Sequence, residues 1–181
     1  MRLHVNKRCR NTSERGFTLI EVLIAIAILT LGAGGVAAMQ LHALRTARHS
    51  SYQTSATQLA VELADIMRAN PEAAHSSVNP YLFSYQADAQ VTATSSLSPC
   101  VLHTCDAAAM AHADVAGWQQ RLQQSIPLAS AVVCRDSHPA MTHGLRWDCD
   151  HAGHAAIIIK IGWPDSPALA SGPAIAIAVE I

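Results

Sequence analysis

The feature that most constrains this chain is an uninterrupted apolar run near its N-terminus. Residues 17–41 make up 25 positions, and the carboxylate of Glu21 is their only charge. At 1.5 Å per residue a helix of this length spans about 37 Å, which is enough for the hydrocarbon core of a bilayer. The sequence therefore predicts a membrane-spanning helix, and a charged residue within such a segment is a functional hypothesis by default.

Charge is distributed unevenly around this run. Residues 1–16 carry five Lys and Arg against one Glu, a net charge of +4, and residues 17–181 carry seven against twelve, a net charge of −5. A basic segment in front of a spanning helix stays cytoplasmic, so we expect the chain after the helix to be exported. Direct nucleic-acid binding is not expected, because it needs clustered Lys and Arg. Removal of the whole run as a secretory signal is disfavoured by its length.

The helical signal continues beyond the run to the first breaker, Asn70 followed by Pro71. We expect one helix over residues 17–69, membrane-spanning over 17–41 and amphipathic over 42–69. The amphipathic half has an apolar stripe that either packs against a head domain or binds a partner protein. The stripe comprises Tyr52, Ala56, Leu59, Leu63, Ile66 and Met67.

Residues 70–181 predict an α+β head with an antiparallel sheet, which the amphipathic half of the long helix is available to cover. A helix begins after Asp106, or in a shorter version after Asp114, and ends before Pro127. Large side chains alternate with small or polar ones over residues 174–181, so one face of this strand is apolar. Further short β-like runs lie at residues 81–85, 90–94, 131–135 and 155–163, and a loop is expected at residues 95–100.

The cysteines indicate disulfides. Cys9 lies in the basic leader, which leaves Cys100, Cys105, Cys134 and Cys149 as an even set in the exported part. Exported compartments are oxidising, so two structural disulfides are expected. Joining sequence neighbours, Cys100 to Cys105 and Cys134 to Cys149, is the natural choice among three connectivities.

Four histidines surround the second cysteine pair: His138, His143, His151 and His154. With a thiolate of Cys134 or Cys149 their spacing is compatible with Zn²⁺, but the sequence lacks His-Glu-x-x-His and Cys-x-x-Cys. It also lacks Gly-x-Ser-x-Gly and a glycine-rich phosphate loop. We therefore expect no metal site, no cofactor and no enzyme activity. A membrane-anchored metal-binding or hydrolytic protein is kept as an alternative.

The hexapeptide Gly16-Phe17-Thr18-Leu19-Ile20-Glu21 behind a basic leader resembles the class III signal of type IV pilins and of the pseudopilins of type II secretion. The resemblance implies that leader residues 1–16 are removed by a prepilin peptidase, which cuts between Gly16 and Phe17 and methylates Phe17. It also implies an assembly role for Glu21, whose carboxylate is tolerable in lipid when the amine of Phe17 on a neighbouring subunit pairs with it.

A fibre-forming helix of this family often melts locally near a proline, but Ala38 stands in that region here. Weakening of the helix would then depend on Gly32, Gly34 and Gly35, because glycine disfavours helix.

The later sequence is similar to PilV-type minor pilins, which share an Asp-x3-Trp helix leading to a proline and a late strand ending in tryptophan. The matching residues are Asp114, Trp118, Pro127 and Trp163. This resemblance implies a minor pilin that primes pilus assembly with major and minor pilins and the inner-membrane assembly machinery, and so serves adhesion or twitching. The chain would sit in the inner-membrane bilayer with its head in the periplasm, and then in the fibre. A minor pseudopilin of a type II secretion system is the alternative.

Overall fold

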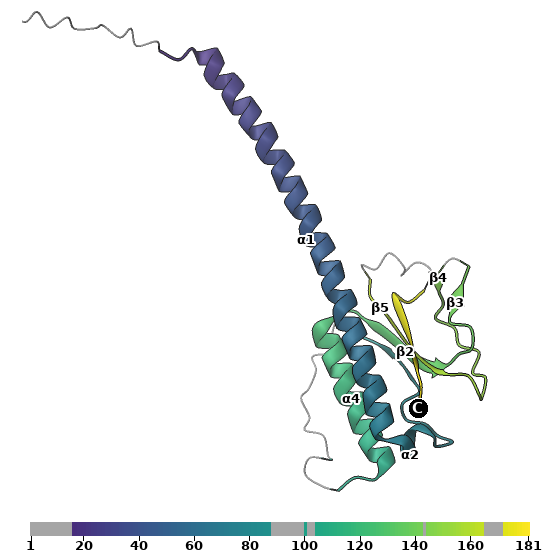
Figure 1. Cartoon of the computed structure of the whole chain (residues 1–181). Helices are drawn as coiled ribbons and strands as arrows, with labels where there is room; N and C mark the ends of the chain where they lie inside the picture. The colour runs from purple at the N-terminus through teal and green to yellow at the C-terminus, as the bar shows by residue number, and fades with distance from the viewer. Residues whose placement is uncertain (1–15, 88–99, 101–103, 143, 165–171) are drawn as a thin grey trace, which may run out of the picture. The chain divides into compact units, whose positions relative to one another are not determined.

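The computed structural model describes residues 16–87, 100, 104–142, 144–164 and 172–181 (Figure 1). The chain divides into two compact units, Met1–Arg45 and Thr46–Ile181, and helix α1 (Leu19–Ala69) contributes to both. Every described residue of the first unit is exposed. Helix α1 confirms the predicted helix over residues 17–69, but it begins two residues later, at Leu19. We call Thr46–Ile181 the head unit.

Within the head unit, α1 buries a stripe of small and large apolar side chains. Its buried members are Ala56, Leu59, Ala60, Leu63, Ala64 and Met67. Four of the six residues of the predicted stripe are among them, and the other two, Tyr52 and Ile66, are partly buried against the same core. The stripe is therefore the packing face of the head unit. Asn70 ends α1, and its side chain accepts a hydrogen bond from the backbone N–H of Ala73 at 3.4 Å, which starts the short helix α2 (Pro71–Ala74). No helix was predicted directly after Pro71, so α2 is an addition to the predicted elements.

Helix α4 (Ala107–Ser125) lies beside α1 in Figure 1. The carboxylate of Asp106 accepts a hydrogen bond from the backbone N–H of Ala109 at 2.7 Å, so Asp106 is the N-cap as predicted. The shorter helix starting after Asp114 is wrong, because Asp114 lies inside α4. The buried indole of Trp118 donates from Nε1 to the carbonyl of Leu59 at 2.8 Å, which ties α4 to α1.

The main sheet is antiparallel and has the order β1-β2-β5-β6. It contains most of the predicted strands with somewhat different bounds, and the α+β prediction is confirmed. The expected strand at residues 90–94 and most of the expected loop at 95–100 lie outside the described residues. The four strands are β1 (Phe83–Gln86), β2 (Ser130–Arg135), β5 (Ile157–Gly162) and β6 (Ile175–Val179).

Strand β5 is buried along its whole length. Ile157, Ile159 and Ile161 join the core that α1 and α4 share with the sheet. The opposite face of β5 carries Ile158 and Lys160, which are also buried. Residues between β2 and β5 cover this second face and include a small hairpin that was not predicted, β3 (Ala140–Met141) with β4 (Gly144–Leu145).

Two glycines allow this covering segment to approach closely. A Cβ atom at Gly162 would lie 2.8 Å from Cζ2 of Trp147, and one at Gly172 would overlap the carbonyl of Leu145. Backbone and indole therefore occupy the space that side chains would fill at these two positions. The sheet is therefore covered on both faces at β5, whereas Ser84 and Gln86 of β1 and Ala178 of β6 are exposed.

Candidate functional site

The first candidate site is the start of α1. Thr18 precedes the helix, and its hydroxyl accepts a hydrogen bond from the backbone N–H of Glu21 at 3.4 Å. A threonine followed by glutamate three residues later is the pattern of a helix N-cap, and a carboxylate in the first turn also interacts favourably with the helix dipole. Glu21 lies in the first turn of α1, so its position follows from local helix chemistry.

The side chains of Phe17 and Glu21 are exposed. They line a shallow groove along the first turns of the helix, together with Val22, Ala25, Ile26 and Leu29. Among the described residues the Glu21 carboxylate has no ion pair and no side-chain hydrogen bond.

The glycines of the apolar run are helical in the structure. Gly32, Gly34 and Gly35 lie within α1, and a Cβ atom at any of them would meet no heavy atom within 4 Å. Packing inside this chain therefore does not require glycine at these positions.

Apolar exposure is concentrated in the same segment. The most apolar 18-residue stretch of α1 has a mean hydropathy of 2.3 and is 0% buried. The helix is long and apolar enough to cross a membrane. Leu19, Leu29 and Leu31 are each at least 70% exposed. The helix and the motif before it indicate that the chain is anchored in a membrane.

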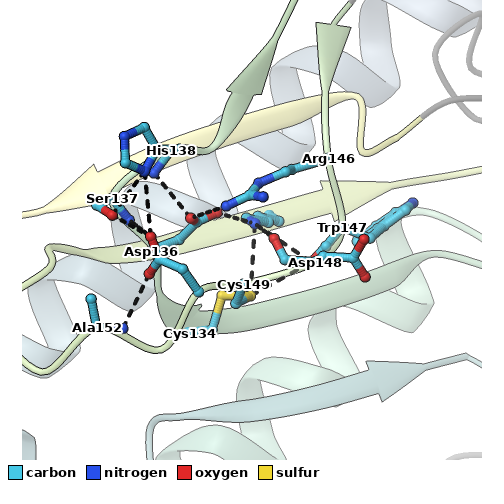
Figure 2. Close-up of a disulfide and its surroundings, with 11 residues drawn as sticks. Cys134, Asp136, Ser137, His138, Arg146, Trp147, Asp148, Cys149 and Ala152 are labelled. Atoms are coloured by element: carbon cyan, nitrogen blue, oxygen red, sulfur yellow. Dashed lines mark hydrogen bonds and ion pairs between the residues drawn. A yellow bond between two sulfur atoms is a disulfide. The ribbon is translucent and has the colours of Figure 1, made fainter.

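The second candidate site surrounds a disulfide of the head unit. The structure contains the disulfides Cys100–Cys105 and Cys134–Cys149. Cys134 lies in β2, and Cys149 closes what we call the disulfide loop, residues 134–149 (Figure 2). The leader cysteine, Cys9, lies outside the described residues.

A group of charged side chains links the disulfide loop to β5. The Nζ of Lys160 donates to Oδ2 of Asp136 at 2.6 Å, and Nη2 of Arg146 donates to Oδ1 of the same carboxylate at 2.9 Å. The side chains of Lys160 and Asp136 are 0% exposed, and that of Arg146 is 26% exposed. Lys160 also donates to the carbonyl of Asp148 at 2.8 Å. We call Asp136, Arg146 and Lys160 the buried ion cluster.

Hydrogen bonding decides the protonation state of Asp136. Burial alone would raise the pKa of this carboxyl group, but the hydrogen bonds from Lys160, from the backbone N–H of His138 and from Arg146 together outweigh burial. The pKa of Asp136 therefore lies below its ordinary value. At the loop surface, the hydroxyl of Ser137 and the backbone N–H groups of Ala152 and Ser137 likewise lower the pKa of Asp150.

Acid should therefore destabilise the head unit. Asp136 and Asp150 titrate below the unfolded value of about 3.9, so the unfolded chain binds protons more readily and stability falls as the pH drops below about 4. Thermal melts of the full chain in detergent between pH 6 and pH 2 will measure this slope. Asp150→Asn should make the slope shallower. Equal slopes in the two chains would contradict the assignment.

Of the four histidines around the second cysteine pair, His138 has polar neighbours close to its ring. Nδ1 of His138 lies 3.0 Å from the hydroxyl of Ser137 and 3.6 Å from Oδ2 of Asp150, and the His138 ring is 80% exposed. His143 lies outside the described residues. No group of three or more His, Cys, Asp or Glu side chains suitable for a metal ion is found among the residues that the structure describes.

The buried ion cluster is the feature that sequence reasoning missed. One signal was available: Lys160 is the only charge in a strand of isoleucines that was expected to be buried. A buried lysine requires an anionic or carbonyl partner. Asp136, which lies 24 residues away, could not be chosen from the pattern.

Comparison with known families gives two adjoining matches. The family described as Prokaryotic N-terminal methylation motif matches residues 11–37, which include Gly16, Phe17 and Glu21. This motif implies processing by a prepilin peptidase and assembly with other pilins. The family described as Type IV pilin Tt1218 matches residues 38–116.

The two matches run without a gap over residues 11–116, more than half of the 181-residue chain. The searches against curated proteins and against solved structures give no match. The first match covers the exposed apolar start of α1, and both matches indicate a structural role for the protein. The chain belongs to the type IV pilin superfamily.

Proposed function

We propose that this chain is a minor pilin of the PilV type, which primes pilus assembly together with other pilins and so supports adhesion or twitching. The observation that carries the proposal is the exposed apolar half of α1, whose single carboxylate, Glu21, has no partner among the described residues. Such a helix is stored in a bilayer and then transferred into the helical core of a fibre.

The proposed ion pair between Glu21 and an amine of a neighbouring subunit follows from the free-energy cost of an unpaired charge in lipid. A carboxylate costs about 2.5 to 3.5 kcal/mol at the centre of a bilayer and less near its edge. Cleavage between Gly16 and Phe17 creates a new amine four residues before Glu21. When this amine belongs to a neighbouring subunit, the ion pair favours correctly docked subunits over misplaced ones. The assembly role of Glu21 is therefore a docking role.

The arrangement of the chain in the cell follows from its segments. Leader residues 1–16 are cytoplasmic and removed, residues 17–41 span the inner membrane, residues 42–69 continue the helix and residues 70–181 form the periplasmic head. The net charge of +4 in the leader supports this orientation. Gly32, Gly34 and Gly35 allow the helix to loosen during assembly, because glycine is a weak helix former.

The PilV-type assignment is supported by where the residues of that resemblance lie. Trp118 and Trp163 are 0% and 1% exposed, and both belong to the core of the head unit. Pro127 lies in the turn between α4 and β2. The pKa of Asp114 is raised, because the effect of burial outweighs the opposite effects of a hydrogen bond from Tyr81 and of the charge of Arg121. Trp118 thus packs α4 against α1, and the ring of Trp163 lies 6.3 Å from that of Tyr52 on α1.

Processing is tested by changing the leader. Gly16→Ala should abolish cleavage by the prepilin peptidase, because the enzyme requires glycine before the cut. N-terminal mass spectrometry of membrane extracts will measure it, with a chain that begins at methylated Phe17 expected only without the substitution. Gly32→Ala is the matched control and should be processed normally. Normal-sized mature chain from Gly16→Ala would refute the leader assignment.

The proposed role as a minor subunit is tested by measuring how much of this chain the fibres contain. Quantitative mass spectrometry of sheared fibres should find this chain at a small fraction of the major pilin, and its deletion should reduce the number of fibres. A chain that forms most of the fibre, or that is absent from it, would refute the assignment. A minor pseudopilin shares the processing motif, and a gene neighbourhood of secretion components would favour that alternative.

A further inference from the structure

The buried ion cluster holds one more cation than anions. The carboxylate of Asp136 is shared between the ammonium of Lys160 at 2.6 Å and the guanidinium of Arg146 at 2.9 Å. One negative charge therefore faces two positive charges in a region where Lys160 and Asp136 are fully buried. An excess positive charge in such surroundings favours any anion that forms beside it.

The sulfur of Cys149 is the group beside this excess charge. The Nζ of Lys160 lies 3.7 Å from Sγ of Cys149. Lys160 also donates to the carbonyl of Asp148 at 2.8 Å and lies 3.5 Å from that of Trp147, so the ammonium is held among the backbone groups that precede Cys149. A thiolate at Cys149 would add a second anion beside the two cations. The carboxylates that flank Cys149 are those of Asp148 and Asp150; both residues are exposed, and Asp150 accepts a hydrogen bond from the hydroxyl of Ser137.

The two cysteines differ in access. Cys134 is 3% exposed, in β2, whereas Cys149 is only partly buried in the loop. The pairing of β2 with β5, which brings Asp136 near Lys160, consists of backbone ladder bonds and does not depend on the disulfide. In the reduced chain the more accessible cysteine is therefore also the one next to the cations.

Thiolates, and not thiols, attack disulfides, and a neighbouring cation increases the thiolate fraction of a cysteine. We propose that Cys149 is the cysteine through which the Cys134–Cys149 bond is made, with Lys160 as its positioning residue. The substrate class is a reactive disulfide, R–S–S–R. This inference does not depend on the role of the chain in the fibre.

The exchange takes two steps. The thiolate of Cys149 attacks one sulfur of R–S–S–R, forms a mixed disulfide and expels R–S⁻. Cys134 then loses its proton and attacks the sulfur of Cys149, which closes the protein disulfide and expels the second R–S⁻. Two electrons pass from the two cysteines to the external disulfide, and the two protons of the cysteines are taken up as two R–SH form.

Single-thiol variants of the full chain in detergent test this assignment. In a Cys9→Ser background, Cys134→Ala leaves Cys149 free and Cys149→Ala leaves Cys134 free. Each chain is treated with iodoacetamide and, separately, with hydroxyethyl disulfide between pH 5 and pH 9, and the modified cysteine is quantified by mass spectrometry. Cys149 is expected to react about tenfold faster at pH 7 than Cys134, with the midpoint of its pH profile shifted downward.

The cations are tested in the chain that keeps Cys149. Lys160→Met should slow its alkylation at pH 7 about tenfold, and Arg146→Gln should slow it less. Arg146→Lys preserves the charge and should preserve the rate. Near-UV circular dichroism checks that each variant is folded. When the chains are unfolded in guanidinium chloride, all alkylation rates should become equal. If Lys160→Met does not fold, Arg146→Gln decides the outcome.

Two results would overturn the proposal. One is a Cys134 that reacts as fast as Cys149 in the folded chains. The other is a pH profile of Cys149 that stays unchanged when the charge of Arg146 is removed from a folded chain. The Arg146→Lys control separates an effect of charge from a general loosening of the disulfide loop, since loosening would also accelerate the lysine variant.

Discussion

Replacing Lys160 with methionine is expected to lower the free energy of unfolding of the chain by about 3 to 5 kcal/mol. The substitution leaves the carboxylate of Asp136 buried with Arg146 as its only charged partner. It also removes the donor that holds the carbonyl of Asp148. Urea titration of the full chain in detergent, followed by the fluorescence of the buried tryptophans, will measure the change.

The origin of this loss is tested by a double variant. Lys160→Met combined with Asp136→Asn removes both buried charges of the closest pair, so the loss should be clearly smaller than the sum of the two single losses. Arg121→Met is the matched control, because Arg121 pairs with Glu62 at 2.6 Å but both side chains are more than 40% exposed. Its effect should stay within about 1 kcal/mol. Additive losses at positions 160 and 136 would contradict a coupled buried pair.

Replacing Glu21 with alanine is expected to leave the chain in the membrane while reducing its incorporation into fibres by about tenfold or more. The change removes the only charge from residues 17–41, so insertion is not weakened. It also removes the partner of a neighbouring Phe17 amine, and each 1.4 kcal/mol of lost docking energy lowers incorporation about tenfold. Immunoblots of membrane and sheared-fibre fractions will measure the ratio of the two pools.

Two further variants sharpen this test. Glu21→Gln keeps the size of the side chain and should impair incorporation nearly as much, because the charge is what the amine requires. Thr30→Ala alters another polar residue of the same run, whose hydroxyl only returns to the carbonyl of Ala27 at 2.9 Å, and should have no effect. Undiminished incorporation of Glu21→Ala would count against the docking role.

Local patterns explain which parts of the fold were predictable. The long helix, the start of α4 at Asp106 and the strand β6 each follow from periodicity or from one capping residue, and such signals need only neighbouring positions. The hairpin of β3 and β4 has two residues in each strand, which is too short for alternation to be seen. Helix α2 has four residues and follows from the side chain of Asn70 as its cap.

The two candidate sites differ in the same way in how far the sequence could predict them. The peptide from Gly16 to Glu21 is read directly, because its residues act in a linear motif. The buried ion cluster joins Asp136, Arg146 and Lys160, which come from three separate parts of the chain. The register of β2 on β5 brings Asp136 to Lys160, and the course of the disulfide loop after β4 brings Arg146 to the same carboxylate. That register depends on which faces of the sheet are covered.

The covering of β5 on its second face has a consequence for how the surface of the protein can vary. The disulfide loop is tied to the core by Lys160 and by the indole of Trp147 against Gly162, so its opening belongs to the same cooperative event as the unfolding of the sheet. Outward residues such as Met141, which is 63% exposed, take no part in these ties. Sequence drift at such positions can change what the loop presents while its backbone keeps one shape.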